Sequence, residues 1–258
     1  MEYILTYKNE QVAKLVLNRP EVFNSFNREM AIQLQQQLDD LGQNPDIRCV
    51  VITGMGKAFC AGQDLQEAID PNGPGLEKIL NEHYNPIITK LRKIPKPVIA
   101  AVNGVAAGAG ANIAIACDLV VASDQASFIQ AFSKIGLIPD SGGTYFLPRL
   151  IGWQRASALM LTGDKISAAD AKEMGMIYKV FSQESFTEEV DKIALQISKM
   201  PTMALFHTRE LLNKSFTNDW QMQLKDELAM QITCGMSYDY QEGVQAFLEK
   251  RKPEFKGK

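Results

Sequence analysis

Histidine is scarce in this chain of 258 residues, which contains only two, His83 and His207. They lie far apart in the sequence, and neither falls within a spaced group of cysteines or carboxylates. A zinc site takes three or four such ligands, and a Ser-His-Asp triad requires a histidine that a carboxylate orients. The sequence therefore argues against both kinds of site. We expect no bound metal and structural roles for the two histidines.

Cysteines and long apolar runs are also few. The four cysteines are widely spaced, with no Cys-x-x-Cys, which is typical of reduced buried thiols and favours a reducing cytoplasm. No apolar run reaches the ~18 residues that span a bilayer, and the N-terminus lacks the basic and apolar regions of a signal peptide. The net charge of -3 gives no reason to expect nucleic acid or a membrane surface as a partner. We therefore expect a cytoplasmic protein.

Two common nucleotide-binding signatures are missing. A P-loop requires G-x-x-x-x-G-K followed by Ser or Thr, and this pattern does not occur. A dinucleotide site requires G-x-G-x-x-G after a strand. The nearest match begins at Gly108, but Ile113 stands where the third glycine belongs. The sequence therefore argues against both kinds of nucleotide site.

The stretch 96–118 is the feature around which the rest of the chain is organised. Its apolar run Val98–Val102 predicts a buried strand. A loop of small residues then leads into a run that is apolar all round, which predicts a buried helix. No Ser, Thr, Asp or Asn stands immediately before Gly108, so the first N–H groups of the helix need another partner. That partner is either a ligand atom or, if Gly108 is a plain N-cap, closely packed backbone.

Strands alternate with helices up to about residue 181, which predicts an α/β fold. We expect a core over 1–181 and a C-terminal helical region over 182–258. Pro71–Gly75 is the best candidate for a lid. The expected strands are 3–7, 12–17, 49–53, 98–102, 119–122 and 176–181. The clearest expected helices are one capped by Asn27, one capped by Ser167 with Asp170, and 76–93, 153–161, 186–199, 202–213, 220–233 and 238–251.

A strand, a glycine loop, an Ala-Gly pair and a helix follow one another twice, around Ala61 and around Ala109. Each loop can present a backbone N–H group. Two such donors aimed at one point form an oxyanion hole, which suits acyl derivatives whose carbonyl oxygen becomes an enolate or a tetrahedral oxyanion.

The segments 57–65 and 97–110 resemble the two oxyanion-hole segments of the crotonase (enoyl-CoA hydratase/isomerase) superfamily. Segments 142–144, 161–163 and 242–251 also match, so the resemblance runs nearly end to end. It implies a crotonase-like spiral of ββα repeats, a C-terminal helical region used in trimer formation, and an acyl-CoA substrate. It also implies a homotrimer or a dimer of trimers, and coenzyme A only as part of the substrate.

The resemblance further implies roles for particular residues. The backbone N–H groups of Ala61 and Ala109 would hold the thioester oxygen. Phe247 and Lys250 match positions that contact the CoA nucleotide, from a neighbouring subunit. The segment expected to lie against the CoA moiety consists of Ala61, Gly62, Gln63 and Asp64.

The sequence departs from the hydratases of this superfamily at two positions. The two glutamates that activate water in those enzymes align with Asn112 and Phe132. Because neither residue is a carboxylate, this departure argues against hydration. Phe132 would line the substrate site. Asn112 would orient a water molecule or the substrate, or else be a polar side chain satisfied inside a buried helix.

Asp140 is the remaining acid on the matching loops. From the residues alone, it would be an N-cap over Gly142 and Gly143. With the resemblance, it lies where several isomerases of the superfamily carry their acid/base. A single carboxylate can take a proton from one carbon and return it to another. The apolar neighbours expected to raise its pKa are Phe128, Phe132, Ile138 and Tyr145.

The resemblance therefore implies an acyl-CoA isomerase. Its motifs match best the branch that converts ring-1,2-epoxyphenylacetyl-CoA to oxepin-CoA in aerobic phenylacetate breakdown. The same proton shuttle would serve Δ3,Δ2-enoyl-CoA isomerisation or a hydratase-like enzyme of fatty-acid β-oxidation. A second alternative makes Asp140 a nucleophile, as in hydrolases or dehalogenases of the superfamily. A third is an acyl-CoA-binding scaffold subunit without activity.

Overall fold

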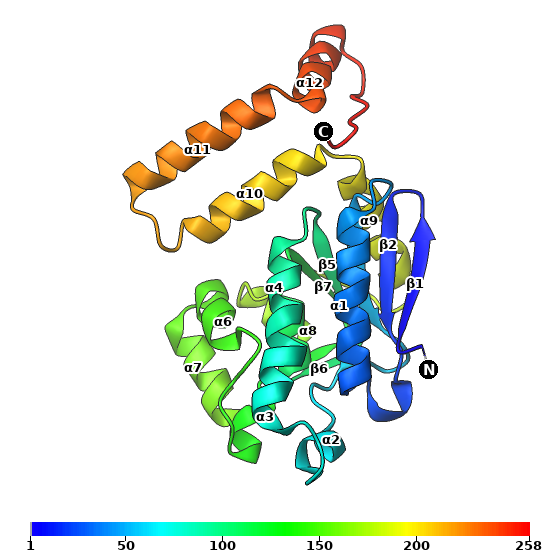
Figure 1. Cartoon of the computed structure of the whole chain (residues 1–258), viewed down its shortest axis with the longest axis vertical. Coiled ribbons are helices and arrows are strands. Elements are labelled where there is room, and N and C mark those ends of the chain that lie inside the picture. The colour runs from blue at the N-terminus through cyan, green and yellow to red at the C-terminus, as the bar shows by residue number, and fades with distance from the viewer. Residues whose placement is uncertain (1) are drawn as a thin grey trace.

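The computed structural model describes residues 2–258 and contains two β-sheets (Figure 1). The larger sheet has the strand order β1-β2-β3-β5-β7-β10. Its first two strands form an antiparallel pair, and the others run parallel. Parallel strands are buried on both faces, which accounts for their runs of Val, Ile and Ala. The six strands are Ile4–Asn9, Val12–Leu17, Cys49–Gly54, Val98–Val102, Leu119–Ser123 and Lys179–Phe181.

The smaller sheet has the order β4-β6-β8-β9. Its strands are Ala58–Cys60, Val105–Ala107, Ser127–Ile129 and Lys165–Ser167. Strands β4, β6 and β8 each follow a strand of the larger sheet directly in the chain. The turn into β6 is so close that a Cβ on Gly104 would collide with the Lys57 carbonyl oxygen and lie 2.7 Å from the carbonyl carbon. These paired strands, each followed by helix, confirm the predicted α/β fold of ββα repeats.

Helices cover one face of the larger sheet (Figure 1). The Asn27 side chain caps α1 by accepting from the Met30 N–H, as predicted. The predicted helix over 76–93 is interrupted by a π-helix, Ile79–Tyr84. The α-helices are α1 (Arg28–Gln43), α2 (Leu65–Ile69), α3 (Gly75–Lys78), α4 (Asn85–Lys93), α5 (Ala109–Ala116), α6 (Gly143–Ile151), α7 (Trp153–Thr162), α8 (Ala168–Glu173) and α9 (Phe186–Ser198). Two 3-10 helices span Pro20–Val22 and Ala131–Ile135.

Helix α9 covers the other face of the larger sheet. Its Phe186, Val190 and Ala194 form a separate apolar cluster with residues of β2, β3, β5 and β7. The helix thus packs on the strands although it follows residue 181. The boundary between 181 and 182 stays a prediction, and residue 1 of the predicted core lies outside the described residues.

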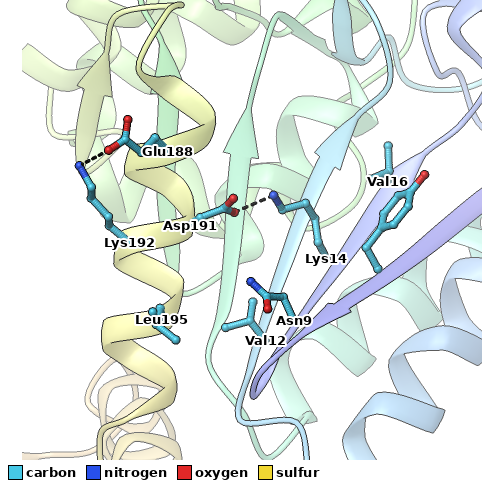
Figure 2. A pocket seen from close by; sticks show the side chains of 9 residues that line it. Asn9, Val12, Lys14, Val16, Glu188, Asp191, Lys192 and Leu195 are labelled. Atoms are coloured by element: carbon cyan, nitrogen blue, oxygen red, sulfur yellow. Dashed lines mark ion pairs between the residues drawn. The ribbon is translucent and has the colours of Figure 1, made fainter.

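A groove lies between α9 and the outer strands of the larger sheet (Figure 2). Two ion pairs are found along it: Lys14 Nζ lies 2.6 Å from Asp191 Oδ1, and Lys192 Nζ lies 2.7 Å from Glu188 Oε1. The groove is on the face that carries α9. The predicted site residue Ala109 belongs to the core cluster on the opposite face, so this groove is not the predicted site.

Three C-terminal helices form an arm that projects from the core (Figure 1). They are α10 (Thr202–Lys214), α11 (Trp220–Gly235) and α12 (Tyr238–Glu249). Helix α11 has no buried residue. Within residues 2–258, no helix combines the length and the apolar character needed to cross a membrane.

Candidate active site

Helix α5 begins without a side-chain cap, as predicted. Gly108 precedes it with φ 53° and ψ −128°, a conformation that favours glycine. The first intrahelical bond runs from the Asn112 N–H to the Gly108 carbonyl. The N–H groups of Ala109 and Gly110 therefore have no acceptor within the helix. This free N–H is consistent with Ala109 as an oxyanion donor, which stays a prediction.

The prediction that the Ala61 N–H is the second donor is wrong. This N–H already donates to the Phe23 carbonyl oxygen at 2.9 Å. Phe23 and Asn24 both have positive φ, and they form a tight turn beside β4. The buried Asn24 side chain fixes this turn by donating to the carbonyls of Met55 and Ala58. No local sequence signal placed this turn against Ala61.

Gln63 presents the N–H that Ala61 does not. Gln63 forms an isolated parallel bridge with Phe26. In this bridge, Phe26 donates to the Gly62 carbonyl and accepts from the Asp64 N–H. The N–H of Gln63 itself therefore points away from Phe26. A Cβ built on Gly62 would lie 3.3 Å from the Ala109 nitrogen, so the two loops lie close together. An oxyanion hole formed by them stays a prediction.

The side chains around Gln63 are fixed by hydrogen bonds. Gln63 Oε1 accepts from the Tyr84 hydroxyl at 3.0 Å, and Gln63 Nε2 donates to Glu67 at 2.8 Å. Tyr84 ends the π-helix and is fully buried. Asp64 caps α2 through the Gln66 N–H and pairs with Arg19 at 2.9 Å. The backbone of this segment is therefore held firmly, and its contact with CoA stays a prediction.

Asp140 lies on the loop before α6. Its backbone carbonyl accepts from the Gly143 N–H at 2.8 Å and from Asn112 Nδ2 at 2.9 Å. The Asp140 carboxylate accepts a 2.8 Å hydrogen bond from the Ser141 hydroxyl. No side chain caps α6, so the alternative of the Asp140 side chain as an N-cap is wrong. The backbone carbonyl of Asp140 accepts the Gly143 N–H instead.

The pKa of Asp140 is raised from its ordinary value because partial burial desolvates the carboxylate. Hydrogen bonds from the Ser141 hydroxyl and from the backbone N–H of Asp140 oppose this rise. The predicted rise is thus present. Of the expected neighbours, Phe128 is part of the buried core, while Ile138 is 82% exposed and Tyr145 is 39% exposed.

Asn112 is fully buried in α5, and both ends of its amide are engaged. Its Nδ2 donates to the Asp140 carbonyl, and its Oδ1 accepts from Gln130 Nε2 at 2.9 Å. A Cβ on Gly143 would lie 2.7 Å from Asn112 Cγ, so the loop packs tightly on this amide. These contacts match the interpretation of a satisfied polar side chain. Substrate contact by Asn112 stays a prediction.

Phe132 belongs to the 3-10 helix Ala131–Ile135. Its side chain lies beside Gly108, the residue that precedes α5. Its ring atom Cζ is 3.8 Å from the position of a Cβ on Gly108, and the residue is 5% exposed. An apolar ring therefore lies beside Gly108 and the start of α5, at a position where the sequence lacks the hydratase glutamate. Substrate contact by Phe132 stays a prediction.

Phe247 and Lys250 lie at the other end of the molecule. Phe247 is in α12 and is 83% exposed, and Lys250 ends that helix in a left-handed conformation. Figure 1 shows α12 and α2 at opposite ends of the molecule. The structure thus does not bring these two residues to the site of the same chain. Their contact with CoA from a neighbouring subunit stays a prediction.

Known proteins of similar sequence point to one family. The family model described as enoyl-CoA hydratase/isomerase matches residues 7–258. The 1,2-epoxyphenylacetyl-CoA isomerase of Escherichia coli is 47% identical, over 100% of both chains. The trans-2-decenoyl-acyl-carrier-protein isomerase of Streptococcus mutans is 36% identical, over 99% of this chain and 98% of its own.

Among solved structures, the enoyl-CoA hydratase of Bacillus anthracis superposes with a TM-score of 0.92. It is 35% identical and is matched over 99% of this chain and 100% of its own. A match of this extent, together with the family model and the relatives, decides the family. The chain belongs to the enoyl-CoA hydratase/isomerase family.

Proposed function

We propose that the protein is an acyl-CoA isomerase that converts ring-1,2-epoxyphenylacetyl-CoA to oxepin-CoA (2-oxepin-2(3H)-ylideneacetyl-CoA) in aerobic phenylacetate breakdown. The observation that carries this proposal is the placement of Asp140. Its loop is bonded through Asn112 to α5, the helix that presents the Ala109 N–H. The full-length likeness to the Escherichia coli isomerase supports the choice of substrate.

In the proposed mechanism, the thioester oxygen accepts hydrogen bonds from the N–H groups of Ala109 and Gln63. Asp140 takes a proton from the methylene carbon beside the thioester, and the negative charge moves onto the bound oxygen. Each such donor is worth roughly 3–4 kcal/mol when charge develops there. Asp140 then returns the proton to a ring carbon. The ring carbon–carbon bond of the epoxide breaks to give the seven-membered ring, so no atom is gained or lost.

The residues favour isomerisation over hydration. Hydration by a pair of glutamates requires two carboxylates to activate water, whereas this chain has Asn112 and Phe132 at the two positions that align with those glutamates. A Δ3,Δ2-enoyl-CoA isomerase is the second candidate, since the same carboxylate and oxyanion hole serve it. The likeness to the Streptococcus mutans isomerase favours this candidate.

The test is incubation with a panel of acyl-CoAs that includes the ring epoxide and a straight-chain 3-enoyl-CoA, with product identification by mass spectrometry. We expect oxepin-CoA from the epoxide. Reaction of the 3-enoyl-CoA alone would contradict the proposed substrate and support the second candidate. A panel left wholly unchanged, with binding still seen by calorimetry, would indicate a scaffold. A trapped covalent acyl-enzyme would indicate that Asp140 is a nucleophile.

We further propose that the protein works in the cytoplasm as a homotrimer or a dimer of trimers. The region 182–258 would supply both the subunit contacts and, through Phe247 and Lys250, the contacts with CoA. Exposed apolar side chains along α11 and α12 support subunit contacts there; they include Leu224, Leu228, Ile232, Val244 and Leu248. Light scattering after size-exclusion chromatography tests the assembly. A monomer at micromolar concentration would contradict it.

A further inference from the structure

We propose that Ser141 is a positioning residue, which holds the Asp140 carboxylate by one oxygen and leaves the other free to move the proton. This inference rests on the proposed function, since it assigns Ser141 a role in proton transfer by Asp140. In this role, Ser141 does not touch the reacting atoms. It acts through the carboxylate that does.

The first observation is the hydrogen bond itself. The Ser141 hydroxyl donates to Asp140 Oδ1 at 2.8 Å, and Ser141 is only 2% exposed. A buried hydroxyl has little access to water, so its proton is committed to this acceptor. An ionised carboxylate accepts at both oxygens. Within residues 2–258, Ser141 is the only other residue seen to donate to this carboxylate, so we assign Oδ2 to the substrate proton.

The second observation is the backbone of Ser141. Its φ of 51° is in the left-handed region, which is costly for a residue with a Cβ. Glycine would adopt this conformation more easily, and the two residues that follow, Gly142 and Gly143, are both glycines. A strained side-chain-bearing residue beside the acid/base indicates that the side chain has a task there.

The third observation is the support behind Ser141. The carbonyl of Asp140, which belongs to the same peptide as the Ser141 nitrogen, accepts from both Asn112 Nδ2 and the Gly143 N–H. Because a carbonyl only accepts, Asn112 must turn its Nδ2 toward it, and Gln130 then donates to Asn112 Oδ1. This chain of donors fixes the peptide that places the Ser141 hydroxyl.

The electrostatic surroundings of Asp140 make the Ser141 hydroxyl important for stabilising the charged carboxylate. Within residues 2–258 no ion pair to Asp140 is found. The phenol of Tyr84, at the end of the π-helix, interacts electrostatically with the negative charge of Asp140. Burial raises the pKa of this phenol well above its ordinary value. From β4, the Cys60 thiol lies near that phenol, and burial raises its pKa to about 12. Both groups are neutral at physiological pH, so the Ser141 hydroxyl and the Asp140 N–H are the donors that favour the charged carboxylate.

The test compares Ser141→Ala with Ser141→Gly. Both variants lose the hydroxyl, but only the glycine relieves the backbone strain. In both, we expect the acid limb of the kcat/KM profile for the acyl-CoA that the wild type turns over to move up by about one pH unit. Below both limbs, kcat/KM would then fall about tenfold, with KM nearly unchanged. Ser133→Ala, at an exposed serine of the neighbouring 3-10 helix, is the matched control.

A second measurement separates this inference from the proposed function. Infrared titration of the enzyme without substrate follows the protonated carboxyl band that Asp140→Asn lacks. We expect this band to titrate at a higher pH in Ser141→Ala and Ser141→Gly than in the wild type. Unchanged titration in both variants would overturn the inference. A shift in the glycine variant alone would overturn it too, because relief of the backbone strain would then be the cause. If the wild type turns over no acyl-CoA, the proposed function fails while the infrared test of the Ser141 bond remains decisive.

Discussion

All eight residues of α5 are buried, whereas none of the sixteen residues of α11 is. Both helices carry many apolar side chains, but α5 is enclosed by the core of its own chain. In helix α11, Leu224, Leu228 and Ile232 are each more than half exposed. The proposed oxyanion donor Ala109 and the loop of the proposed acid/base Asp140 therefore depend on contacts within the core. The arm carries apolar surface that its own chain does not cover.

The arm is joined to the core by buried cations rather than by a broad apolar face. Arg209 of α10 is 6% exposed, pairs with Asp118 at 3.0 Å, and donates to the carbonyls of Lys96 and Ile94. Arg48, just before β3, donates to Thr202 Oγ1 at 2.9 Å and to the Phe255 carbonyl at 2.6 Å. These bonds fix where the arm leaves the core, so we expect chemistry and arm placement to respond to different substitutions.

The largest expected effect comes from Asp140→Asn in the core. Loss of the acid/base should lower kcat by about 10²–10⁴-fold, while acyl-CoA still binds by calorimetry. Because burial raises the pKa of Asp140, the folded state favours the neutral carboxyl, and wild-type stability falls as the pH rises through this range. Asn is neutral at every pH. The variant should therefore have a higher Tm than the wild type at pH 7, with the difference vanishing in acid.

The next effect concerns the joint between the two regions. Arg209→Met removes the 3.0 Å ion pair with Asp118, which keeps only a 3.6 Å pair with Arg92, and it leaves the Lys96 and Ile94 carbonyls without their donor. We therefore expect a loss of about 1–3 kcal/mol in the free energy of unfolding. Denaturant titration measures this loss. Lys192→Met is the control, because Lys192 pairs with Glu188 and Glu189 on the exposed side of α9 (Figure 2). An equal loss in both variants would contradict the anchoring role of Arg209.

On the arm, we expect Leu228→Glu to disrupt assembly without unfolding the core. Leu228 is 62% exposed in the single chain, so a charge there costs little until a second subunit covers it. Light scattering should show smaller species at micromolar concentration, while the circular dichroism of the monomer stays native. Retention of the wild-type mass would indicate that α11 is not a subunit interface.

The smallest effects come from a pair of glycines, one in each region. Gly143→Ala adds a Cβ 2.7 Å from Asn112 Cγ, so we expect a loss of about 1–3 kcal/mol in stability and a lower kcat from a displaced Asp140 loop. Gly235→Ala in α11 meets no atom within 4 Å, so we expect a gain of about 0.5–1 kcal/mol. Thermal unfolding measures both. A neutral Gly143→Ala would show that the loop adapts easily.

The fold was predictable where the signal is local. Asn27 and the Ser167–Asp170 capping box lie where the sequence placed them. The three-residue strands of the smaller sheet were missed because three residues are too few to show a period. The π-helix was missed because its residues have the same apolar spacing as an ordinary helix.

The sequence predicts which loops and helices carry the candidate site better than it predicts which backbone N–H groups and side chains are available there. Ala109 and Asp140 lie on the expected loops. The choice of Ala61 over Gln63 depended on which N–H faces Phe23 and Phe26, and these contacts are distant in sequence. The task of Asn112 likewise depended on Gln130 and on the Asp140 carbonyl. Local pattern reveals where a donor lies, but only the fold reveals which donors are already used.

The most direct test of the account is deuterium uptake from D2O into phenylacetyl-CoA, which offers the methylene proton but no epoxide. If Asp140 removes that proton while Ala109 and Gln63 hold the oxygen, the wild-type enzyme should exchange the methylene hydrogens. Asp140→Asn should bind the same thioester and exchange none above background. Exchange by Asp140→Asn at the wild-type rate would contradict the central claim that this carboxylate carries the proton.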